Sequence, residues 1–213
     1  MQISGSDMNA SVSTDELMAK GIAVSIGHRA ENIEGADCVI RTAAANNDNP
    51  EIAAARATGI PIFERAQAWG YIMKAYRHAI CVSGTHGKTT TTSMLTQIFM
   101  EAGKDPTVMI GGSLPLLGAG HRVGQGDTII LESCEYCNSF LNFFPTTAVV
   151  LDIDADHLDF FKDLEDVKHS FRRFAELVPA DGLIVANGDD KNTLDALDGL
   201  SLVRFGMAET NDV

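Results

Sequence analysis

The sequence predicts an α/β protein with two domains, and two observations favour this fold class. First, short apolar runs typical of strands alternate along the 213 residues with segments that carry helix start and stop signals. Such alternation is typical of parallel sheets with crossover helices. Second, the alternation restarts with longer units after residue 77. We therefore expect a first domain over residues 1–77 and a second over residues 78–213.

In the first domain, the helix predicted at 50–58 has the clearest ends. Asp48 or Asn49 can serve as the N-cap, Pro50 takes the first helical position, and Gly59 follows the end. The other predicted elements are strands at 21–26, 37–42 and 60–63 and helices at 14–20 and 65–76. Short strands separated by helices imply parallel pairing.

In the second domain, a long helix is predicted at 88–102, directly after a strand at 79–83. The helical face expected to pack on the sheet carries Met94, Leu95, Ile98, Phe99 and Ala102. Further strands are predicted at 128–131, 147–151 and 182–186, with a helix at 164–177. The stretch 111–126 is rich in glycine and is expected to form loops.

The composition is that of a globular protein with an excess of acidic residues. Apolar residues make up 45% and charged residues 21%, the formal net charge is −13, and the pI is near 4.7. This charge argues against nucleic acid as a partner, because lysine and arginine supply the affinity for phosphate backbones. Apolar runs are shorter than the roughly 18 residues of a membrane span. Four cysteines are too few for a disulfide scaffold. We expect a cytoplasmic protein without membrane insertion, and its oligomeric state stays open.

Both ends of the sequence predict a piece of a longer protein. A dinucleotide-binding type of fold places a first strand and a glycine-rich turn before a strand that ends in an acidic residue. Here the segment SGSD follows only three residues. The C-terminal segment GMAETNDV carries no stop signal. We therefore expect both domains to be incomplete.

The stretch GTHGKTT, residues 84–90, predicts a nucleotide-binding loop between a strand and a helix. Threonines such as the four at 89–92 cost up to about 0.7 kcal/mol each in a helix interior. At a helix N-terminus their hydroxyls can satisfy free N–H groups, and the same end attracts anions. Lys88 adds a mobile cation, and Thr89 would place its hydroxyl on Mg²⁺. The general phosphate-loop pattern is longer, since its first glycine would fall on Val82. A glycine turn without a ligand is the alternative.

Acidic residues follow two further predicted strands. Glu132 and Glu135 follow one of them, and the other runs into a segment with four aspartates and His157. If these strands run parallel to 79–83, all three carboxyl ends open on one edge, where ligands bind in open α/β folds. A triphosphate with Mg²⁺ needs hard oxygen ligands. Together with the loop, Glu135 and His157 are therefore predicted site residues.

The same side chains also have simpler interpretations. Taken alone, Glu135 fits a solvated loop acid, and His157 fits a helix cap or a satisfied buried histidine. His86 fits either catalysis or a role in shaping the loop backbone. Surface or helix positions are expected for His28, His78, His121 and His169.

A cysteine pair and an aspartate pair also stand near the predicted strands. The cysteines have a structural interpretation, and the interpretation of the aspartates stays open. Cys134 and Cys137 have no second pair to complete a zinc site and are interpreted as half-buried thiols. Asp189 and Asp190 follow the strand at 182–186 and fit either a nucleotide pocket or a chain turn.

Three segments of the sequence resemble the Mur ligases, a family that builds the peptide of the bacterial cell wall. They are GTHGKTT at 84–90, ESCEYCNSF at 132–140 and DIDADHLD at 152–159. The resemblance covers nearly all of residues 1–195. The first-domain segments GIAVSIGHRAENIEGADCVI and DNPEIAAARATGIPIFERA are similar to the branch that adds L-alanine to UDP-N-acetylmuramate.

The resemblance implies an ATP-dependent ligase of peptidoglycan synthesis. Its first domain would be Rossmann-like and bind a UDP-sugar, and its second would be a P-loop-type α/β domain that binds ATP. ATP would phosphorylate the lactyl carboxylate of UDP-N-acetylmuramate, and the amine of L-alanine would attack the acyl phosphate. By motif position, the nucleotide would be held by Gly84, Thr85, His86, Gly87, Lys88, Thr89 and Thr90. Catalysis would rest on Lys88, Glu135 and His157. Thr89 and Glu135 would ligate Mg²⁺, with His157 at a second metal position.

The sequence departs from the family pattern at three positions and in length. Family members commonly carry aspartates at the positions of Cys134 and Cys137 and an asparagine at the position of Asp152. By the resemblance, we expect the given residues to lack the first glycine-rich turn and a third domain, and we therefore expect little or no ligase activity from this chain alone. Two alternatives stay open. One is another ligase of the superfamily, such as one that recycles murein peptides, and the other is a nucleotide-binding module without catalysis.

Overall fold

The structure is a computed structural model that describes residues 1–42, 44–115 and 117–213. Its internal contacts divide the chain into two compact units, Met1–Ala68 and Trp69–Val213. This division falls inside helix α3 (Arg65–Met73), and the predicted domain boundary after residue 77 stays a prediction. Among the described residues, no helix combines the length and the apolar character that crossing a membrane requires.

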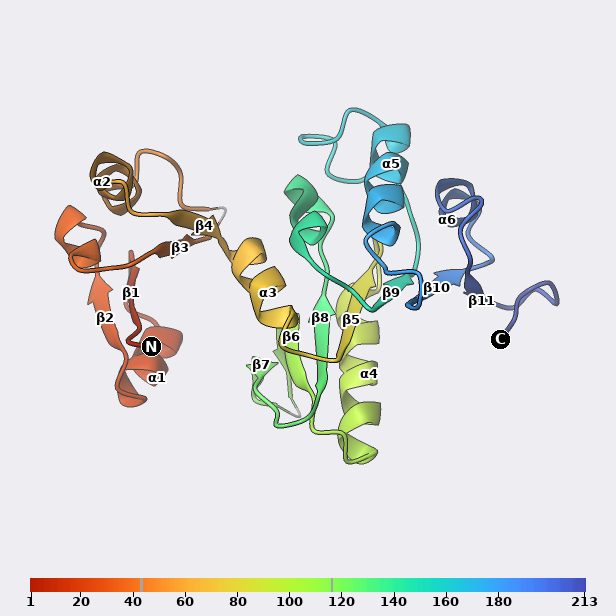
Figure 1. Ribbon diagram of the computed structural model, residues 1–213, viewed down its shortest axis with the longest axis horizontal. Helices are drawn as coiled ribbons and strands as arrows, with labels where there is room; N and C mark the ends of the chain where they lie inside the picture. Colours follow the sequence, from red (N-terminus) through yellow and green to blue (C-terminus); the bar gives the residue numbers. More distant parts are fainter. Residues whose placement is uncertain (43, 116) are drawn as a thin grey trace. The chain divides into compact units, whose positions relative to one another are not determined.

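The first unit contains two separate pairs of parallel strands. β1 (Ser4–Asp7) pairs with β2 (Ala23–Ile26), and β3 (Val39–Arg41) pairs with β4 (Ile62–Glu64). The connecting helices are α1 (Val12–Ala19), the short η1 (Ala30–Ile33) and α2 (Pro50–Thr58) (Figure 1). The predicted parallel direction is confirmed, but the strands form two separate pairs and not the one sheet that was expected, and β1 adds a strand to those predicted.

Helix α2 begins and ends as the sequence predicts. Asn49, rather than Asp48, is the N-cap, and its side-chain oxygen accepts from the N–H groups of Glu51 (2.9 Å) and Ile52 (3.4 Å). Gly59 ends the helix with a φ of 75°, a left-handed conformation that glycine adopts without steric cost.

Glu51, in the first turn of α2, is a buried carboxylate that contacts three polar side chains. Ser6 donates to it at 2.7 Å, Asn32 donates at 2.6 Å, and the His28 ring nitrogen lies 3.5 Å away. Burial raises the pKa of Glu51, but the hydrogen bonds from Asn32 and Ser6 and the charge of His28 outweigh it and lower the pKa. His28, expected as an isolated surface or helix position, therefore lies in a polar cluster at the ends of β1 and β2.

The second unit is built on a mixed sheet with helices on both faces. Its strands are β5 (His78–Ser83), β6 (Thr107–Leu114), β7 (Ala119–Arg122), β8 (Thr128–Glu132), β9 (Thr147–Val150), β10 (Leu183–Asn187) and β11 (Val203–Phe205). Within the described residues, their order is β11-β10-β9-β5-β8-β6-β7. All neighbours are parallel except β6 and β7. The expected parallel arrangement of β5, β8 and β9 is confirmed, so their carboxyl ends share one edge.

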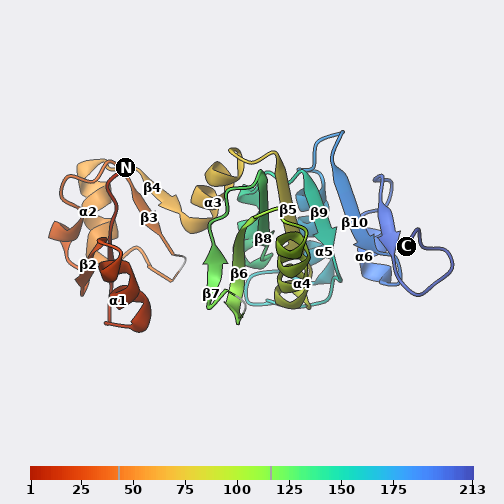
Figure 2. The same cartoon turned by 90° about the horizontal axis from the view of Figure 1, so that it is seen from below.

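Helices cover both faces of this sheet. α4 (Lys88–Glu101) lies on one face and α5 (Leu164–Ala175) on the other (Figures 1 and 2). Two further short helices, η2 (Tyr136–Asn142) and α6 (Lys191–Ala196), were not predicted, and neither was β11. The ring of Phe140, in η2, stacks on Phe174 of α5 and meets Phe171 of α5 edge-on. These contacts join η2 to α5 in a buried aromatic core.

The loops predicted at 111–126 are wrong over about half of this stretch, because β6 extends to Leu114 and β7 spans Ala119–Arg122 as its antiparallel partner, with a register shift. A Cβ on Gly120 would lie 2.6 Å from the carbonyl oxygen of Gly112. The glycine therefore permits a close approach of two strands and does not mark a turn. Residue 116, inside the predicted loop, lies outside the described residues.

The predicted apolar face of α4 is wrong in its orientation. Met94 and Ile98 are 53% and 60% exposed, whereas Thr92 and Thr96 are fully buried. The Thr96 hydroxyl donates to the Thr92 carbonyl at 2.7 Å, and Thr92 bonds one turn back in the same way. Threonines satisfied in this manner can face a core. Leu95 and Phe99 do pack on the sheet, against Val108, Ile110 and Ile130.

Candidate nucleotide-binding site

The loop between β5 and α4 has a backbone that requires glycine at two positions. Gly84 has a φ of 148° and Gly87 a φ of 78°, values that strain other residues. A Cβ on Gly84 would also lie 2.9 Å from both Leu151 Cβ and Asp152 Oδ1. The two glycines therefore let the loop turn against the segment that follows β9 and start α4 at Lys88.

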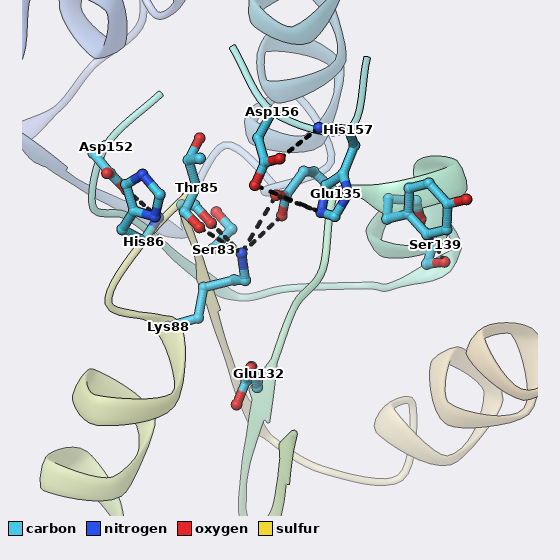
Figure 3. Close-up of polar contacts among 12 residues, drawn as sticks. Ser83, Thr85, His86, Lys88, Glu132, Glu135, Ser139, Asp152, Asp156 and His157 are labelled. Carbon is cyan, nitrogen blue, oxygen red and sulfur yellow. Dashed lines mark hydrogen bonds and ion pairs between the residues drawn. The ribbon is translucent and has the colours of Figure 1, made fainter. Parts of the chain in front are cut away.

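Hydrogen bonds hold this loop to the segment that follows β9. The Thr85 N–H donates to the Asp152 carbonyl at 3.0 Å, and the Asp154 N–H donates to the Thr85 hydroxyl at 2.8 Å. The Asp152 carboxylate accepts from the backbone N–H of His86 at 2.8 Å, and the His86 ring lies beside it (Figure 3). The Asp152 side chain thus fixes the backbone of the loop.

Lys88 points back toward its own loop and toward Glu135 (Figure 3). Its ammonium group donates to the carbonyls of Gly84 (2.5 Å) and Thr85 (3.1 Å) and lies 3.3 and 3.1 Å from the two carboxylate oxygens of Glu135. The Glu135 residue is only 1% exposed. A buried carboxylate is costly unless a cation and hydrogen bonds compensate it, and Lys88 supplies that cation here.

His157 completes this group from the segment that follows β9. Its Nε2 lies 3.7 Å from Glu135 Oε1, and its backbone has a φ of 53°. The ring packs on Tyr136 with centroids 4.7 Å apart, and the Tyr136 hydroxyl donates to Asp159 at 2.8 Å. The Asp159 carboxylate raises the pKa of Tyr136 to about 12. The tyrosine hydroxyl therefore stays protonated and keeps this bond throughout the physiological pH range.

Two family descriptions together match almost the whole chain. The "Mur ligase middle domain" matches residues 82–213, and the "Mur ligase family, catalytic domain" matches residues 1–77. The chain belongs to the Mur ligase family.

Curated relatives of this Mur ligase chain carry one name. The UDP-N-acetylmuramate–L-alanine ligase of Clostridium botulinum (strain Hall) is 51% identical over 190 residues, which are 89% of this chain and 42% of that protein. The ligase of the same name from Caldanaerobacter subterraneus is 46% identical over 212 residues, covering 99% of this chain and 46% of that protein. The chain therefore spans less than half the length of these relatives.

Solved structures of Mur ligases have the same fold. The UDP-N-acetylmuramate:L-alanyl-gamma-D-glutamyl-meso-diaminopimelate ligase of Neisseria meningitides aligns with a TM-score of 0.85 at 27% identity, over 96% of this chain and 70% of that one. The UDP-N-acetylmuramate–alanine ligase of Thermotoga maritima aligns with a TM-score of 0.82 at 30% identity, over 96% and 46%. The predicted α/β class is confirmed.

The structure of the Mur ligase chain brings some predicted site residues together and separates others. Lys88, Glu135 and His157 form one connected group, whereas Thr89 and Thr90 lie exposed in the first turn of α4. The Thr89 hydroxyl donates to Glu132 Oε1 at 2.9 Å and not to this group. Sequence reasoning did not assign Glu132 to the site. The available signal was its place at the last position of β8, directly opposite Val82.

The remaining polar residues near the sheet edge have structural partners. Asp190 caps α6 through the N–H of Thr193 at 2.8 Å and also accepts from the N–H of Ile153 at 3.2 Å. Asp189 accepts from backbone groups near the end of β11. Of the two interpretations of this aspartate pair, these contacts favour the chain turn.

Cys134 and Cys137 are free thiols that flank Glu135 in sequence. Both residues are exposed, which corrects the expected half-buried state. Burial of its sulfur nonetheless raises the pKa of Cys134. Because the thiolate is the reactive form of cysteine, Cys134 is a poor nucleophile at neutral pH.

Proposed function

We propose that this chain supplies the ATP-binding part of a cytoplasmic enzyme that joins L-alanine to UDP-N-acetylmuramate in peptidoglycan synthesis. The observation that carries the proposal is the contact of Lys88 with the buried Glu135, at the end of a glycine loop that starts a helix. Relatives with the corresponding name, 51% and 46% identical, support the choice of substrates. Since the chain spans less than half of their length, the amide-forming reaction is proposed for the whole ligase.

The loop and the start of α4 would bind the phosphates of ATP. The first N–H groups of a helix have no helical partner and lie at the positive end of its dipole. Gly87 is the N-cap of α4 and makes no side-chain capping bond, so these N–H groups are open to an anion. Lys88 would then turn from Glu135 to the β- and γ-phosphates.

The oxygen donors around Lys88 fit a Mg²⁺ ion. Mg²⁺ at nucleotide sites takes one or two protein oxygens and fills its other positions with phosphate and water. Thr89 and Glu135 are donors of this kind, and within the described residues there is no cluster of three acidic, histidine or cysteine side chains that could bind a metal alone. When bound, the ion would neutralise negative charge on the phosphates. His157 would serve a second ion position.

The proposed reaction requires that the protein position the reacting groups and stabilise negative charge, and residues of this chain can do both. The lactyl carboxylate of UDP-N-acetylmuramate takes the γ-phosphoryl group of ATP and releases ADP, and the amine of L-alanine then displaces phosphate to form the amide. Phosphoryl transfer depends on positioning and electrostatic stabilisation more than on a protein nucleophile. Lys88 offers a cation and α4 offers free N–H groups.

The substitution Lys88→Met tests the proposed nucleotide site. A hydrogen bond to a charged group contributes about 1.5–3 kcal/mol, so we expect the affinity for Mg²⁺–ATP, measured by calorimetry on the full chain, to fall about tenfold or more. Lys104→Met, an exposed lysine beyond the other end of α4, is the matched control and should bind as the parent does. Unchanged binding by Lys88→Met would contradict the proposal.

A second candidate, a ligase that recycles murein peptides, is favoured by the Neisseria structure with a TM-score of 0.85. The two functions differ in the amine, which is L-alanine in one case and a peptide beginning with L-alanine in the other. Phosphate release by the whole ligase, with UDP-N-acetylmuramate and either amine, separates them. Release that requires the peptide, and does not occur with L-alanine, would favour the second candidate. ATP binding without release in either case would favour a module that only binds nucleotide.

A further inference from the structure

The segment that carries His157, residues 151–163, forms neither a helix nor a strand. Connections of this length without regular structure are uncommon in a compact domain and often serve function. The backbone turns at His157, where φ is 53°, and the His157 carbonyl accepts from the N–H groups of Phe160 (2.8 Å) and Phe161 (2.9 Å). These bonds fix the backbone at this point, but they leave the imidazole free to rotate about its own side-chain bonds.

Polar contacts hold the His157 imidazole only loosely. Its Nε2 lies 3.7 Å from Glu135 Oε1 and 4.0 Å from Asp156 Oδ2 (Figure 3), which is longer than a hydrogen bond. The imidazole packs on the ring of Tyr136, with centroids 4.7 Å apart and planes inclined at 40°, a separation at which aromatic pairs attract each other. The orientation of the imidazole therefore depends on Tyr136 more than on either acid.

Tyr136 contacts the same segment at three positions. Besides packing on His157, its ring meets Phe160 edge-on with centroids 6.0 Å apart, and its hydroxyl donates to Asp159 at 2.8 Å. Tyr136 begins η2 and directly follows the buried Glu135. This tyrosine therefore ties the segment that follows β9 to the residue next to the carboxylate.

The backbone that carries Tyr136 is itself fixed. Cys137 and Asn138 have φ values of 53° and 54°, which residues other than glycine rarely adopt. The Asn138 N–H donates to the Glu135 carbonyl at 2.8 Å, and the Asn138 side chain accepts from the hydroxyl of Ser170 in α5. Such backbone conformations persist where the surrounding structure holds them. Tyr136 is thus anchored on both sides, by α5 through its own turn and by Asp159 through its hydroxyl.

We propose that Tyr136 is a positioning residue, whose ring holds the His157 imidazole beside Glu135 so that both side chains can contact a divalent cation of the bound nucleotide. The proposal rests on the proposed function, because it assumes that a cation meets His157. Two replacements separate the parts of the tyrosine. Tyr136→Phe keeps the ring and removes the bond to Asp159, whereas Tyr136→Leu removes the ring as well.

The first measurement needs neither nucleotide nor metal. In the full chain with labelled histidine rings, the nuclear magnetic resonance signal of His157 is the one that His157→Ala lacks. We expect the ring current of Tyr136 to shift this signal, Tyr136→Leu to return it toward that of a free histidine, and Tyr136→Phe to keep most of the shift. Tyr71→Leu, which removes an exposed tyrosine of α3, is the matched control and should leave the signal in place. A signal that does not move in Tyr136→Leu would overturn the proposal.

The second measurement is a double-mutant cycle of Tyr136→Leu and His157→Ala. Mn²⁺ is titrated by electron paramagnetic resonance in the presence of a non-hydrolysable ATP analogue. We expect Tyr136→Leu to weaken Mn²⁺ binding about threefold to tenfold, as the loss of one aromatic pair implies, and to have no further effect once His157 is alanine. Tyr136→Phe should restore most of the affinity. With a chelator present, the analogue should bind equally to all of these variants, because Tyr136 acts through the cation.

The outcomes of the cycle separate this proposal from the proposed function. Equal losses from Tyr136→Leu with and without His157 would overturn the positioning role, since Tyr136 would then act independently of the imidazole. Equal losses in Tyr136→Phe and Tyr136→Leu would overturn the role of the ring. No loss from Tyr136→Leu while His157→Ala weakens Mn²⁺ binding would also overturn the proposal but leave the proposed function standing. If neither His157→Ala nor Lys88→Met has an effect, both proposals fail.

Discussion

Lys88 and Glu135 form a close ion pair. The carboxylate is 1% exposed, and the ammonium lies within 3.3 Å of both of its oxygens. If Lys88 turns to a phosphate, as proposed, Glu135 would be left as a buried anion, a state that costs several kcal/mol when it stays uncompensated. A divalent cation at Glu135 removes that cost. Nucleotide and metal should therefore bind with positive coupling.

If the cation and Lys88 compete for Glu135 in this way, the Lys88→Met variant should bind a divalent cation more tightly than the parent does. Without nucleotide, Glu135 of the variant has lost its ammonium partner, so we expect its affinity for Mn²⁺ alone to rise about tenfold, which corresponds to the contribution of one charged contact. Mn²⁺ titration without nucleotide measures this. Lys104→Met should leave the affinity unchanged, and an unchanged affinity in Lys88→Met would exclude this competition.

Glu51 predicts a pH dependence of stability in the first unit. Its pKa is lowered in the folded protein from the ordinary 4.5. The stabilisation is therefore complete above the ordinary value and is lost as the pH falls through the lowered pKa. The His28 ring nitrogen, 3.5 Å from the carboxylate, is the other polar group of this cluster that helps to lower the pKa of Glu51.

In the variant Glu51→Gln, the stability of the first unit should depend less on pH in the acidic range than it does in the parent. We expect it to be less stable than the parent at neutral pH by about 1–3 kcal/mol, with the difference shrinking as the pH falls below 4.5. Denaturant unfolding at several pH values measures the difference. Glu31→Gln, an exposed neighbour in η1, is the control. A constant difference across the pH range would rule out this role of the carboxylate.

At the scale of elements, α4 shows where sequence patterns succeed and where they fail. Its start after Gly87 and its end near Gly103 were predictable, because glycine marks both. Its buried face was not, since Thr92 and Thr96 count as polar in any periodicity although helical carbonyls satisfy their hydroxyls. The same limit applies to β6 and β7. Their glycines suggested loops, whereas close packing of strands requires them.

Thr96 allows this explanation to be tested with two substitutions. Thr96→Val keeps the shape and removes a hydroxyl whose acceptor is already in a helix, so we expect the free energy of unfolding to change by less than about 1 kcal/mol. Thr96→Ala leaves a gap and should cost about 1–2 kcal/mol more. Chemical denaturation compares them. Equal losses in both variants would show that the hydroxyl itself holds the helix in place.

At the scale of the whole molecule, the net charge of −13 opposes the approach of a metal-free nucleotide. Repulsion between like charges slows association, and salt screens it. We expect the association rate constant of ATP in a chelator to rise with ionic strength, and more steeply than that of Mg²⁺–ATP. The chelator itself should weaken equilibrium binding. Stopped-flow measurement with a fluorescent ATP analogue gives these rates, and a rate that falls with salt would contradict the expectation.

The convergence of the three site segments is the part of the architecture that the sequence could predict. Polar residues after three apolar strands imply a common edge if the strands are parallel, and β5, β8 and β9 are parallel. Glu132 could not be assigned in the same way. Its hydrogen bonds are to Thr89 and Gly111, and the neighbourhood of β6 and β8 is a matter of sheet order that no local pattern encodes.

The central place of β5 has a consequence for how the chain folds during synthesis. β5 ends at Ser83, but its two neighbours in the sheet begin only at Thr128 and Thr147. Contacts between residues far apart in sequence form slowly, and chains leave the ribosome N-terminus first. The glycine loop and α4 therefore emerge long before the strands that flank β5 exist. During that interval the apolar β5 is a segment that a nascent-chain chaperone can bind.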